Sequence, residues 1–474
     1  MATVTIMDPV TRIEGHMKVE LTIEQQQIVD ARCTGTLFRG FEKILLGRDA
    51  WDAPVLTQRI CGVCPIAHGQ ASVSALDQAY GHTLTRNGRV LRNLALGANY
   101  LQSHILHFYL LAALDYIKGP QTAPWIPMWE VDLRPGLDAA LQHLPQAIEA
   151  RRRAHEMGAV FTGRMPTAHT FIPGGFTAAP TQDDILRFGA QLSWLTSFIR
   201  DVYIADVLAV ADVYPDFKQV GAGPRNLLAF GVFPTSDDQT QKLLRSGYVR
   251  ASAPSTVNTV RDSDITEHVT YSWYADSTHG AQPVNGDTVP QYPKGSAYSW
   301  LKAPRLGGAP FEVGALARMW VNGDYRSGVS VIDRHAARAL EALKIAEAMA
   351  GWLQQVQPGQ PAHQPAPTRA PSARGVGLTE AARGALGHWV ELTQGRISRY
   401  QVITPTCWNA SPRDASGVLG PMEQALVGVT VRDPQQPIEA LRVIHSFDPC
   451  LSCAVHIMKP RGKTELVYRS SASA

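Results

Sequence analysis

Two Cys-x-x-Cys pairs lie near opposite ends of this chain of 474 residues. The first pair is Cys61 and Cys64 in RICGVCPIAH, and the second is Cys450 and Cys453 in DPCLSCAVH. Cys64 and Cys450 are 386 positions apart, whereas the ligand pairs of a zinc finger are usually separated by about 12 to 20 residues. The two pairs can therefore share a metal only if the tertiary fold brings these distant segments together.

Two thiols on one turn suit a soft or borderline metal, because both sulfurs can reach one ion. Pro65 is expected to be the first residue of a helix, which places Cys64 at a helix N-terminus, where the thiolate is favoured. The pairs alone leave open a dithiol redox pair or a zinc site of four thiolates. A zinc site does not require the other residues found here, which are Arg59 and Asp448 before the pairs and a histidine after each.

The composition is typical of a globular protein, with 45% hydrophobic and 18% charged residues. The numbers of basic and acidic residues, 44 and 41, give no strong field that would indicate a nucleic acid or an anionic membrane as partner. The most apolar stretches, Leu94–Tyr116 and Phe188–Val213, contain charged or imidazole groups and predict buried helices rather than membrane spans. The first residues show no basic segment followed by an apolar run, so we expect no secretory signal.

The hydrophobic pattern predicts a mainly α-helical α+β protein. Alternation predicts a small N-terminal β element from Lys18–Ile23 and Ile28–Cys33. Arg250–Gly307 is predicted to form short strands and loops, and the Pro-rich segment Gln357–Gly375 a surface linker. Helical periodicity predicts five long helices, at Pro65–Gly81, Asn87–Tyr116, Asp138–Arg153, Asp183–Val213 and Arg334–Gln355.

Nine segments, in order, resemble the large subunit of the nickel-iron hydrogenase family. They are DPVTRIEGH (8–16), FRGFE (38–42), GRDAWDAPVLTQRICGVC (47–64), HILHFYLLAALD (104–115), YSWLKAPR (298–305), DRHAARALE (333–341), EAARGALGHW (380–389), PTCWNASPRD (405–414) and HSFDPCLSCAVH (445–456). Such an ordered set is far more specific than either cysteine pair. The resemblance implies one large domain over residues 1–456, followed by a C-terminal extension over 457–474 that is removed during maturation.

The resemblance also implies a set of metal ligands. Cys61, Cys64, Cys450 and Cys453 are similar to the four thiolates that hold nickel in the family. Cys64 and Cys453 would also bridge to an iron ion that carries cyanide and carbon monoxide. His68 would donate a hydrogen bond to a bridging sulfur.

Further site residues follow from the same resemblance. Glu14 is similar to the family glutamate that takes a proton from the thiolate of Cys450. Arg383 matches the guanidinium that lies over the open side of the metal centre. Asp448 would orient this arginine, and Thr406 would donate toward the diatomic ligands.

A second metal site is implied near the C-terminus. Glu42 and His456 match the ligands of a magnesium or iron ion, with a main-chain carbonyl near Val402 as a further ligand. Two departures from the family are visible elsewhere. Ser103 stands where much of the family has an aspartate, and Ala382 replaces a common proline before Arg383.

The function implied is the reversible heterolytic splitting of hydrogen into protons and electrons. Only Cys33 and Cys407 remain outside the pairs, too few to hold an iron-sulfur cluster, so an iron-sulfur small subunit is expected to take the electrons. A membrane cytochrome reached through that subunit, a maturation endopeptidase and nickel-insertion chaperones are further expected partners. The enzyme would be cytoplasmic, or exported or membrane-associated together with the small subunit.

Two other functions remain open at this point. One is a hydrogen-sensing subunit with the same fold, although family sensors usually end at the position of His456 and this chain continues for 18 residues. The other is a related respiratory-complex subunit that has lost the metal ligands. The presence of all four cysteines argues against this second function.

Overall fold

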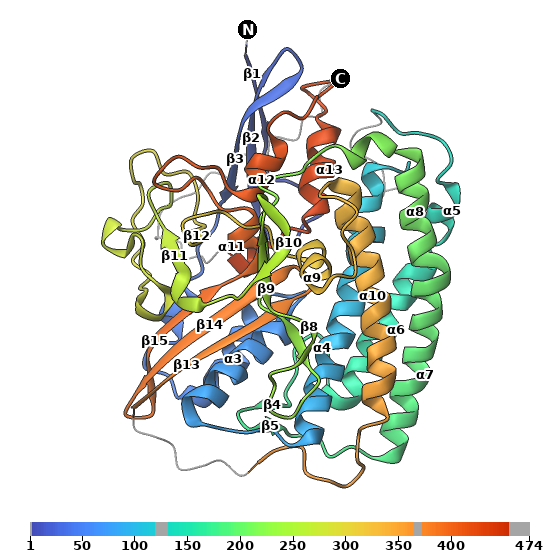
Figure 1. The fold of residues 1–474 in the computed structure, drawn as a ribbon, viewed down its shortest axis with the longest axis vertical. Helices are drawn as coiled ribbons and strands as arrows, with labels where there is room; N and C mark the ends of the chain where they lie inside the picture. The colour runs from blue at the N-terminus through green and yellow to red at the C-terminus, as the bar shows by residue number, and fades with distance from the viewer. Residues whose placement is uncertain (1, 119–130, 365–371, 455–474) are drawn as a thin grey trace, which may run out of the picture.

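The computed structural model describes residues 2–118, 131–364 and 372–454. Long helices lie side by side at one edge of the molecule, and a sheet of three long strands lies at the other edge against a further helix (Figure 1). One large cluster of buried apolar side chains extends from Met7 to Leu451. Within the described residues, no helix has both the length and the apolar character needed to cross a membrane.

The helices and strands have the following bounds. The α-helices are α1 Phe41–Ile44, α2 Ala53–Thr57, α3 Pro65–Tyr80, α4 Arg86–Leu106, α5 Asp138–Gln142, α6 Leu144–Thr162, α7 Gln182–Phe198, α8 Ile204–Val213, α9 Ala315–Asn322, α10 Val331–Leu353, α11 Pro405–Asn409, α12 Pro421–Leu426, α13 Ile438–Ser446 and α14 Leu451–Ala454. The strands are β1 Thr3–Met7, β2 Met17–Glu24, β3 Gln27–Gly35, β4 Phe171–Ile172, β5 Gly175–Phe176, β6 Leu227–Ala229, β7 Val232–Pro234, β8 Lys242–Leu244, β9 Gly247–Arg250, β10 Ala253–Asn258, β11 Ile265–His268, β12 Ala303–Leu306, β13 Ser372–Ala381, β14 Gly384–Thr393 and β15 Arg396–Ile403.

The long predicted helices are confirmed, with local changes. Helix α4 packs against α6 and α10, and α7 packs against both of these. A π-helical segment continues α4 at His107–Ala112, and another joins α7 to α8 at Ile199–Tyr203. The helix predicted at Asp138–Arg153 is divided at His143 into α5 and α6, because Leu144–Thr162 starts a new helix with proline in its first turn.

The predicted N-terminal β element is also confirmed. Strands β1, β2 and β3 form one antiparallel sheet. The odd-numbered residues of β2, from Met17 to Ile23, are buried while their neighbours are more exposed. This alternation is the pattern that predicted the strand. The region Arg250–Gly307 likewise contains short strands, 3-10 turns and loops, as expected.

The sheet β13–β14–β15 was not predicted, and it shortens the predicted linker. Strand β13 begins at Ser372, where it pairs with Thr393 of β14, so the last four residues predicted as linker belong to a sheet. The backbone of β13 lies directly on α3. A Cβ atom at Gly375 would meet the carbonyl oxygen of Ala75 at 1.9 Å, and one at Gly377 would meet that of Ala71 at 2.0 Å. Only glycine fits at this contact.

Gly377→Ala is therefore expected to destabilise the protein by about 1–3 kcal/mol or more, because the added methyl group must push β13 away from α3. Gly351→Ala is the matched control, because no atom lies within 4 Å of its Cβ position in α10. The control should stabilise the protein by about 0.5–1 kcal/mol through its better helix propensity. Denaturant unfolding of both variants measures the difference, and equal unfolding midpoints would contradict the close contact.

Candidate metal centre

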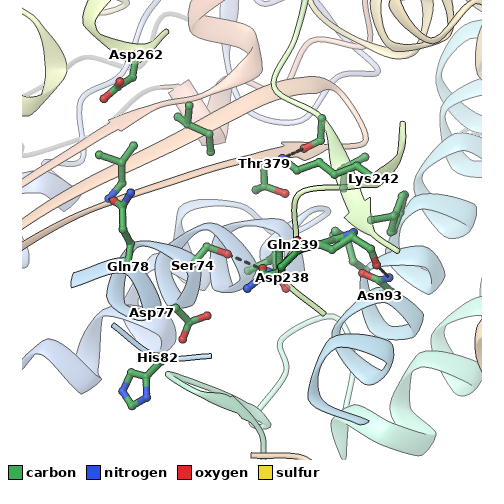
Figure 2. Close-up of a pocket in the computed structure, with 18 residues that line it drawn as sticks. Ser74, Asp77, Gln78, His82, Asn93, Asp238, Gln239, Lys242, Asp262 and Thr379 are labelled. Atoms are coloured by element: carbon green, nitrogen blue, oxygen red, sulfur yellow. Dashed lines mark hydrogen bonds between the residues drawn. The ribbon is translucent and has the colours of Figure 1, made fainter. Parts of the chain in front are cut away.

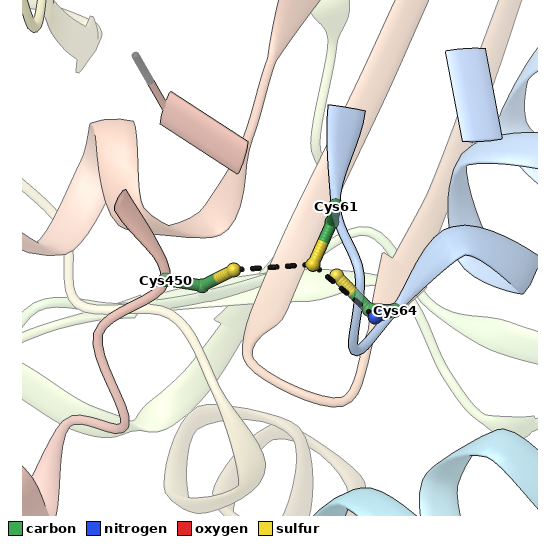
Figure 3. A group of neighbouring side chains, drawn as sticks. All are labelled: Cys61, Cys64 and Cys450. Carbon is green, nitrogen blue, oxygen red and sulfur yellow. Dashed lines mark hydrogen bonds between the residues drawn. The ribbon is translucent and has the colours of Figure 1, made fainter. Parts of the chain in front are cut away.

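Three thiol groups meet inside the protein (Figure 3). The sulfur atoms of Cys61, Cys64 and Cys450 all lie within 4.8 Å of one another, and the Sγ atoms of Cys61 and Cys450 are 3.3 Å apart. All three residues are buried. Three converging sulfurs in a dry site fit a soft or borderline metal ion. The fold thus brings the two distant pairs together, as the sequence required.

The first pair lies on the turn that leads into α3. Cys64 is the N-cap residue of this helix, and Pro65 is its first residue, as predicted. The backbone N–H groups of Val63 and Cys64 donate to the Sγ atom of Cys61 over 3.3 and 3.2 Å. Hydrogen bonds of this kind favour the negatively charged thiolate that binds metal.

The second pair is held by the N-terminal segment and by α11. Glu14 and Cys450 form a parallel β-bridge, and the N–H of Leu451 donates to the carbonyl oxygen of Glu14 at 2.6 Å. The N–H of Cys450 donates to the hydroxyl oxygen of Thr406 at 2.9 Å. Thr406 therefore contacts the loop of Cys450. The backbone of Cys453 is in α14, but its side chain lies outside the described residues.

Arg39 joins the two cysteine segments, and the sequence reasoning did not single it out. Its guanidinium donates to the carbonyl oxygens of Arg59 and Ile60 before the first pair. It also donates to the carbonyl oxygen of Ser452 in the second pair. Arg39 lies in FRGFE, one of the nine segments that resemble the family, and this position in the sequence could have indicated it as a site residue.

Glu14 is half-buried beside the thiols. Burial raises the pKa of its carboxyl group, and negative charge on Cys61 raises this pKa further. The charge of Arg383 and hydrogen bonds from Ser452 and Gly62 act in the opposite direction without cancelling the shift. A carboxyl group with a raised pKa can exchange protons closer to neutral pH than an ordinary glutamate.

Arg383 and Asp448 meet as a buried ion pair. Their Nη2 and Oδ1 atoms are 2.9 Å apart, and each side chain is only 1% exposed. Arg383 also donates from Nη1 to the hydroxyl oxygen of Ser103 at 3.3 Å, so the serine at the departure from the family pattern contacts the arginine. Burial by itself would lower the pKa of Arg383, but the negative charges of Asp448 and the cysteines raise it well above its ordinary value. The guanidinium is therefore a permanent positive charge.

His68 begins a chain of buried hydrogen bonds. Its Nδ1 atom is 3.1 Å from Nε2 of His388, whose Nδ1 atom is 2.8 Å from the hydroxyl of Tyr400. The Tyr400 hydroxyl oxygen lies 3.1 Å from the hydroxyl oxygen of Ser72. Burial lowers the pKa of His68 to about 4, so its imidazole is neutral near pH 7. Among the described residues, Nε2 of His68 has no hydrogen-bond partner.

Glu42 lies in a separate polar cluster. Its Oε1 atom accepts a hydrogen bond from the backbone N–H of Val402 at 2.9 Å, and its Oε2 atom accepts one from Thr288. Nearby, the ammonium group of Lys302 lies 3.1 Å from a carboxylate oxygen of Glu267 and 3.1 Å from the amide oxygen of Gln401. His456, the other predicted ligand, lies outside the described residues.

A surface hollow of about 540 Å³ lies elsewhere, between α3, α4, the β7–β8 hairpin and β13 (Figure 2). None of the three cysteines lines it. The carboxylate of Asp77 in its wall is already paired with Arg92 at 2.6 Å. The hollow is therefore separate from the thiol cluster.

Comparison with known proteins identifies the family. The protein-family model described as nickel-dependent hydrogenase matches residues 39–123, 129–329 and 321–456, and a second family model, described as HoxL-like, matches residues 3–34. The chain belongs to the nickel-dependent hydrogenase family. It is 41% identical to the periplasmic [NiFeSe] hydrogenase large subunit of Desulfomicrobium baculatum, over 95% of this chain and 94% of that protein. It is 31% identical to an uptake hydrogenase large subunit of Rhizobium leguminosarum bv. viciae, over 97% of this chain and 96% of that protein.

The fold agrees with this assignment. The structure of the Ni-Fe-Se hydrogenase from D. vulgaris Hildenborough matches with a TM-score of 0.93 and 41% identity, covering 96% of this chain and 100% of the other. The protein is thus the catalytic large subunit of a nickel-iron hydrogenase, as the sequence predicted. The thiol cluster is the part of the described structure that fits its metal centre.

The purified enzyme is expected to contain both nickel and iron, measured by inductively coupled plasma mass spectrometry. Cys64→Ser should lose the nickel and the infrared bands of iron-bound cyanide and carbon monoxide, because a serine hydroxyl is a poor replacement for a thiolate that is expected to bridge the two metals. Iron in the clusters of the small subunit would remain. Cys33→Ala is the control, since Cys33 is a buried cysteine in β3 outside the cluster. Zinc as the only metal, or equal metal loss in both variants, would contradict the assignment.

Proposed function

We propose that Cys61, Cys64, Cys450 and Cys453 hold a nickel-iron centre whose iron carries cyanide and carbon monoxide. The convergence of three buried thiols within 4.8 Å supports this proposal. When bound, the centre supplies the site at which hydrogen is split heterolytically. Similar proteins are named for nickel, iron and selenium, whereas this sequence contains no selenocysteine. The proposed centre of this chain is therefore held by sulfur alone.

Glu14 moves the proton in this proposal. It accepts a proton from the Sγ atom of Cys450 on a carboxylate oxygen and passes it outward. The β-bridge between Glu14 and Cys450 keeps the two residues adjacent, and the raised pKa of the carboxyl group favours transfer in both directions.

Four residues orient the surroundings of the centre. Arg383 directs a fixed positive charge to the open side, and Asp448 holds its guanidinium. Thr406 holds the loop of Cys450 by accepting a hydrogen bond from the backbone N–H of Cys450, and its hydroxyl hydrogen would be free to donate toward the diatomic ligands. His68 donates from Nε2 to a bridging sulfur, since this atom has no partner among the described residues.

A second ion, magnesium or iron, is proposed at Glu42 and His456. The carboxylate of Glu42 is buried and accepts hydrogen bonds from Thr288 and Val402. Buried carboxylate and imidazole groups suit a hard or borderline divalent cation. Its role is structural, close to the end of the mature chain.

The electrons leave through an iron-sulfur small subunit in our proposal. The similar proteins are named as large subunits or large chains, which implies a smaller partner. One of them, from Wolinella succinogenes, is named a quinone-reactive Ni/Fe-hydrogenase large chain and is 30% identical over 98% of this chain. A membrane cytochrome reached through the small subunit is proposed on this basis, together with either a cytoplasmic or an exported location.

Maturation forms the last part of the proposal. Nickel-insertion chaperones would load the precursor, and an endopeptidase would then cut after His456, leaving residues 1–456 as one domain. The family model ends its match at residue 456, which supports this boundary. The extension contains Lys459, Arg461 and Lys463, and burying such charges unpaired costs several kcal/mol each.

Glu14→Gln is expected to retain nickel and iron while hydrogen/deuterium exchange and turnover fall by about a hundredfold or more, because the amide cannot carry the proton. Glu24→Gln is the control, since Glu24 is exposed at the end of β2. Exchange at the wild-type rate in Glu14→Gln would exclude the proposed relay.

Intact-mass spectrometry tests the maturation proposal. The large subunit of active enzyme should end at His456, and the longer precursor that accumulates should be the form that has not yet received nickel, because cleavage follows nickel insertion. A fully active subunit that still ends at Ala474 would show that cleavage is not required.

A further inference from the structure

Arg383 lies in a hairpin turn that is buried. Strand β13 ends at Ala381 and β14 begins at Gly384, and these two residues pair across the turn. Ala382 and Arg383 therefore form a two-residue loop. Hairpin loops usually lie at the surface, where water satisfies their carbonyl groups. Here Ala382 is 1% and Arg383 is 2% exposed, so the carbonyl groups of the turn need partners inside the protein.

Arg318 of α9 supplies these partners. Its Nη1 atom donates to the carbonyl oxygen of Ala381 at 3.0 Å, and its Nη2 atom donates to that of Ala382 at 2.8 Å. Nη1 also donates to a carboxylate oxygen of Glu380 at 2.8 Å. One guanidinium thus contacts each of the three residues that directly precede Arg383.

The remaining N–H groups of Arg318 bind Glu341. Nε and Nη2 donate to its two carboxylate oxygens, each over 2.6 Å. A guanidinium has five N–H donors, and all five have an acceptor here. The Oε2 atom of Glu341 lies 2.8 Å from Nε2 of His104 in α4. Both members of the Arg318–Glu341 pair are fully buried, and such a pair is stable only when its hydrogen bonds are satisfied.

The start of α9 also lies against the turn. Gly384 has a φ angle of 135°, and a Cβ atom there would meet the backbone nitrogen of Gly314 at 2.7 Å. Gly314 is the N-cap residue of α9. The helix that carries Arg318 is therefore in backbone contact with the hairpin that carries Arg383, so the placement of one constrains the other.

We propose that Arg318, held by Glu341 and His104, is a positioning residue that fixes the buried turn and thereby the placement of Arg383 beside the thiol cluster. Arg318 acts through three contacts to the turn and does not touch the reacting atoms. Lysine cannot replace it, because one ammonium group has three donors and no planar fork. The inference rests on the proposed role of Arg383.

A double-mutant cycle on the heterodimeric enzyme tests this inference. Arg318→Lys should retain nickel and iron but reduce kcat for hydrogen oxidation about ten- to a hundredfold, because a small displacement of a catalytic group has an effect of this size. Added to Arg383→Lys, it should change kcat less than about twofold, since the effects of residues that act as one unit are not additive. The nickel electron paramagnetic resonance signal should shift in Arg318→Lys and be the same in Arg383→Lys and the double variant.

Arg305→Lys is the matched control. Arg305 is also fully buried, and it also makes five donor contacts, to Asp414, Ser411 and the carbonyl oxygens of Pro304, Pro412 and Val418. It contacts no residue of the turn. Its substitution should lower stability, leave the nickel signal unchanged, and have the same effect on kcat in the wild-type and Arg383→Lys backgrounds.

If Arg318→Lys lowers kcat by the same factor in the wild-type and Arg383→Lys backgrounds, the inference is overturned. An unshifted nickel signal in Arg318→Lys would also overturn it. If Arg383→Lys itself leaves kcat and the nickel signal unchanged, the proposed role of Arg383 fails instead.

Should Arg318→Lys not fold, His104→Leu and His104→Gln replace it. The leucine variant should lower kcat only when Arg383 is present, and the glutamine variant, which keeps an N–H donor for Glu341, should restore it. Losses from His104→Leu that do not depend on Arg383 would also overturn the inference.

Discussion

The parallel bridge between Glu14 and Cys450 is the contact on which the candidate centre depends. It attaches the loop of the second cysteine pair to the N-terminal segment through backbone hydrogen bonds. Arg39 then ties this loop to the first pair. These contacts between protein atoms hold the backbone of both pairs in the arrangement that brings three sulfurs together.

The buried charges around the centre are arranged in two layers. The inner layer contains Arg383 and Asp448 beside the cysteines. The outer layer contains Arg318 between Glu341 and Glu380. Each cation has carboxylate partners within the protein, so neither needs water to compensate its charge. In the proposed centre, a dry surrounding of this kind would strengthen the electrostatic effect of Arg383 on the metals.

Local sequence signals predicted part of this structure. Pro65 after Cys64 indicated the start of α3 correctly, because proline fits the first turn of a helix wherever that helix lies. The turn between β14 and β15 carries a local sequence signal in Gly395, and both Gln394 and Gly395 have the positive φ angles that two-residue hairpin turns require. The hairpin at Ala382 could not be recognised locally. Its burial depends on Arg318, which is more than 60 residues away in the sequence. The hydrophobic periodicity of a segment gives no information about such a distant contact. The convergence of the thiols was predicted by family resemblance, whereas the hydrogen bond between Arg383 and Ser103 is seen only in the three-dimensional structure.

The glycine contact between β13 and α3 determines where the first cysteine pair lies. With no side chain between backbone and backbone at Gly375 and Gly377, the sheet and the helix have no room to slide and behave as one stiff block. Cys64 is fixed to the leading end of that block. The loop of Cys450 is held by hydrogen bonds, by one bridge and by the packing of Leu451 in the core. A block held together backbone to backbone gives the first cysteine pair a fixed position, against which the N-terminal segment and Arg39 place the second pair.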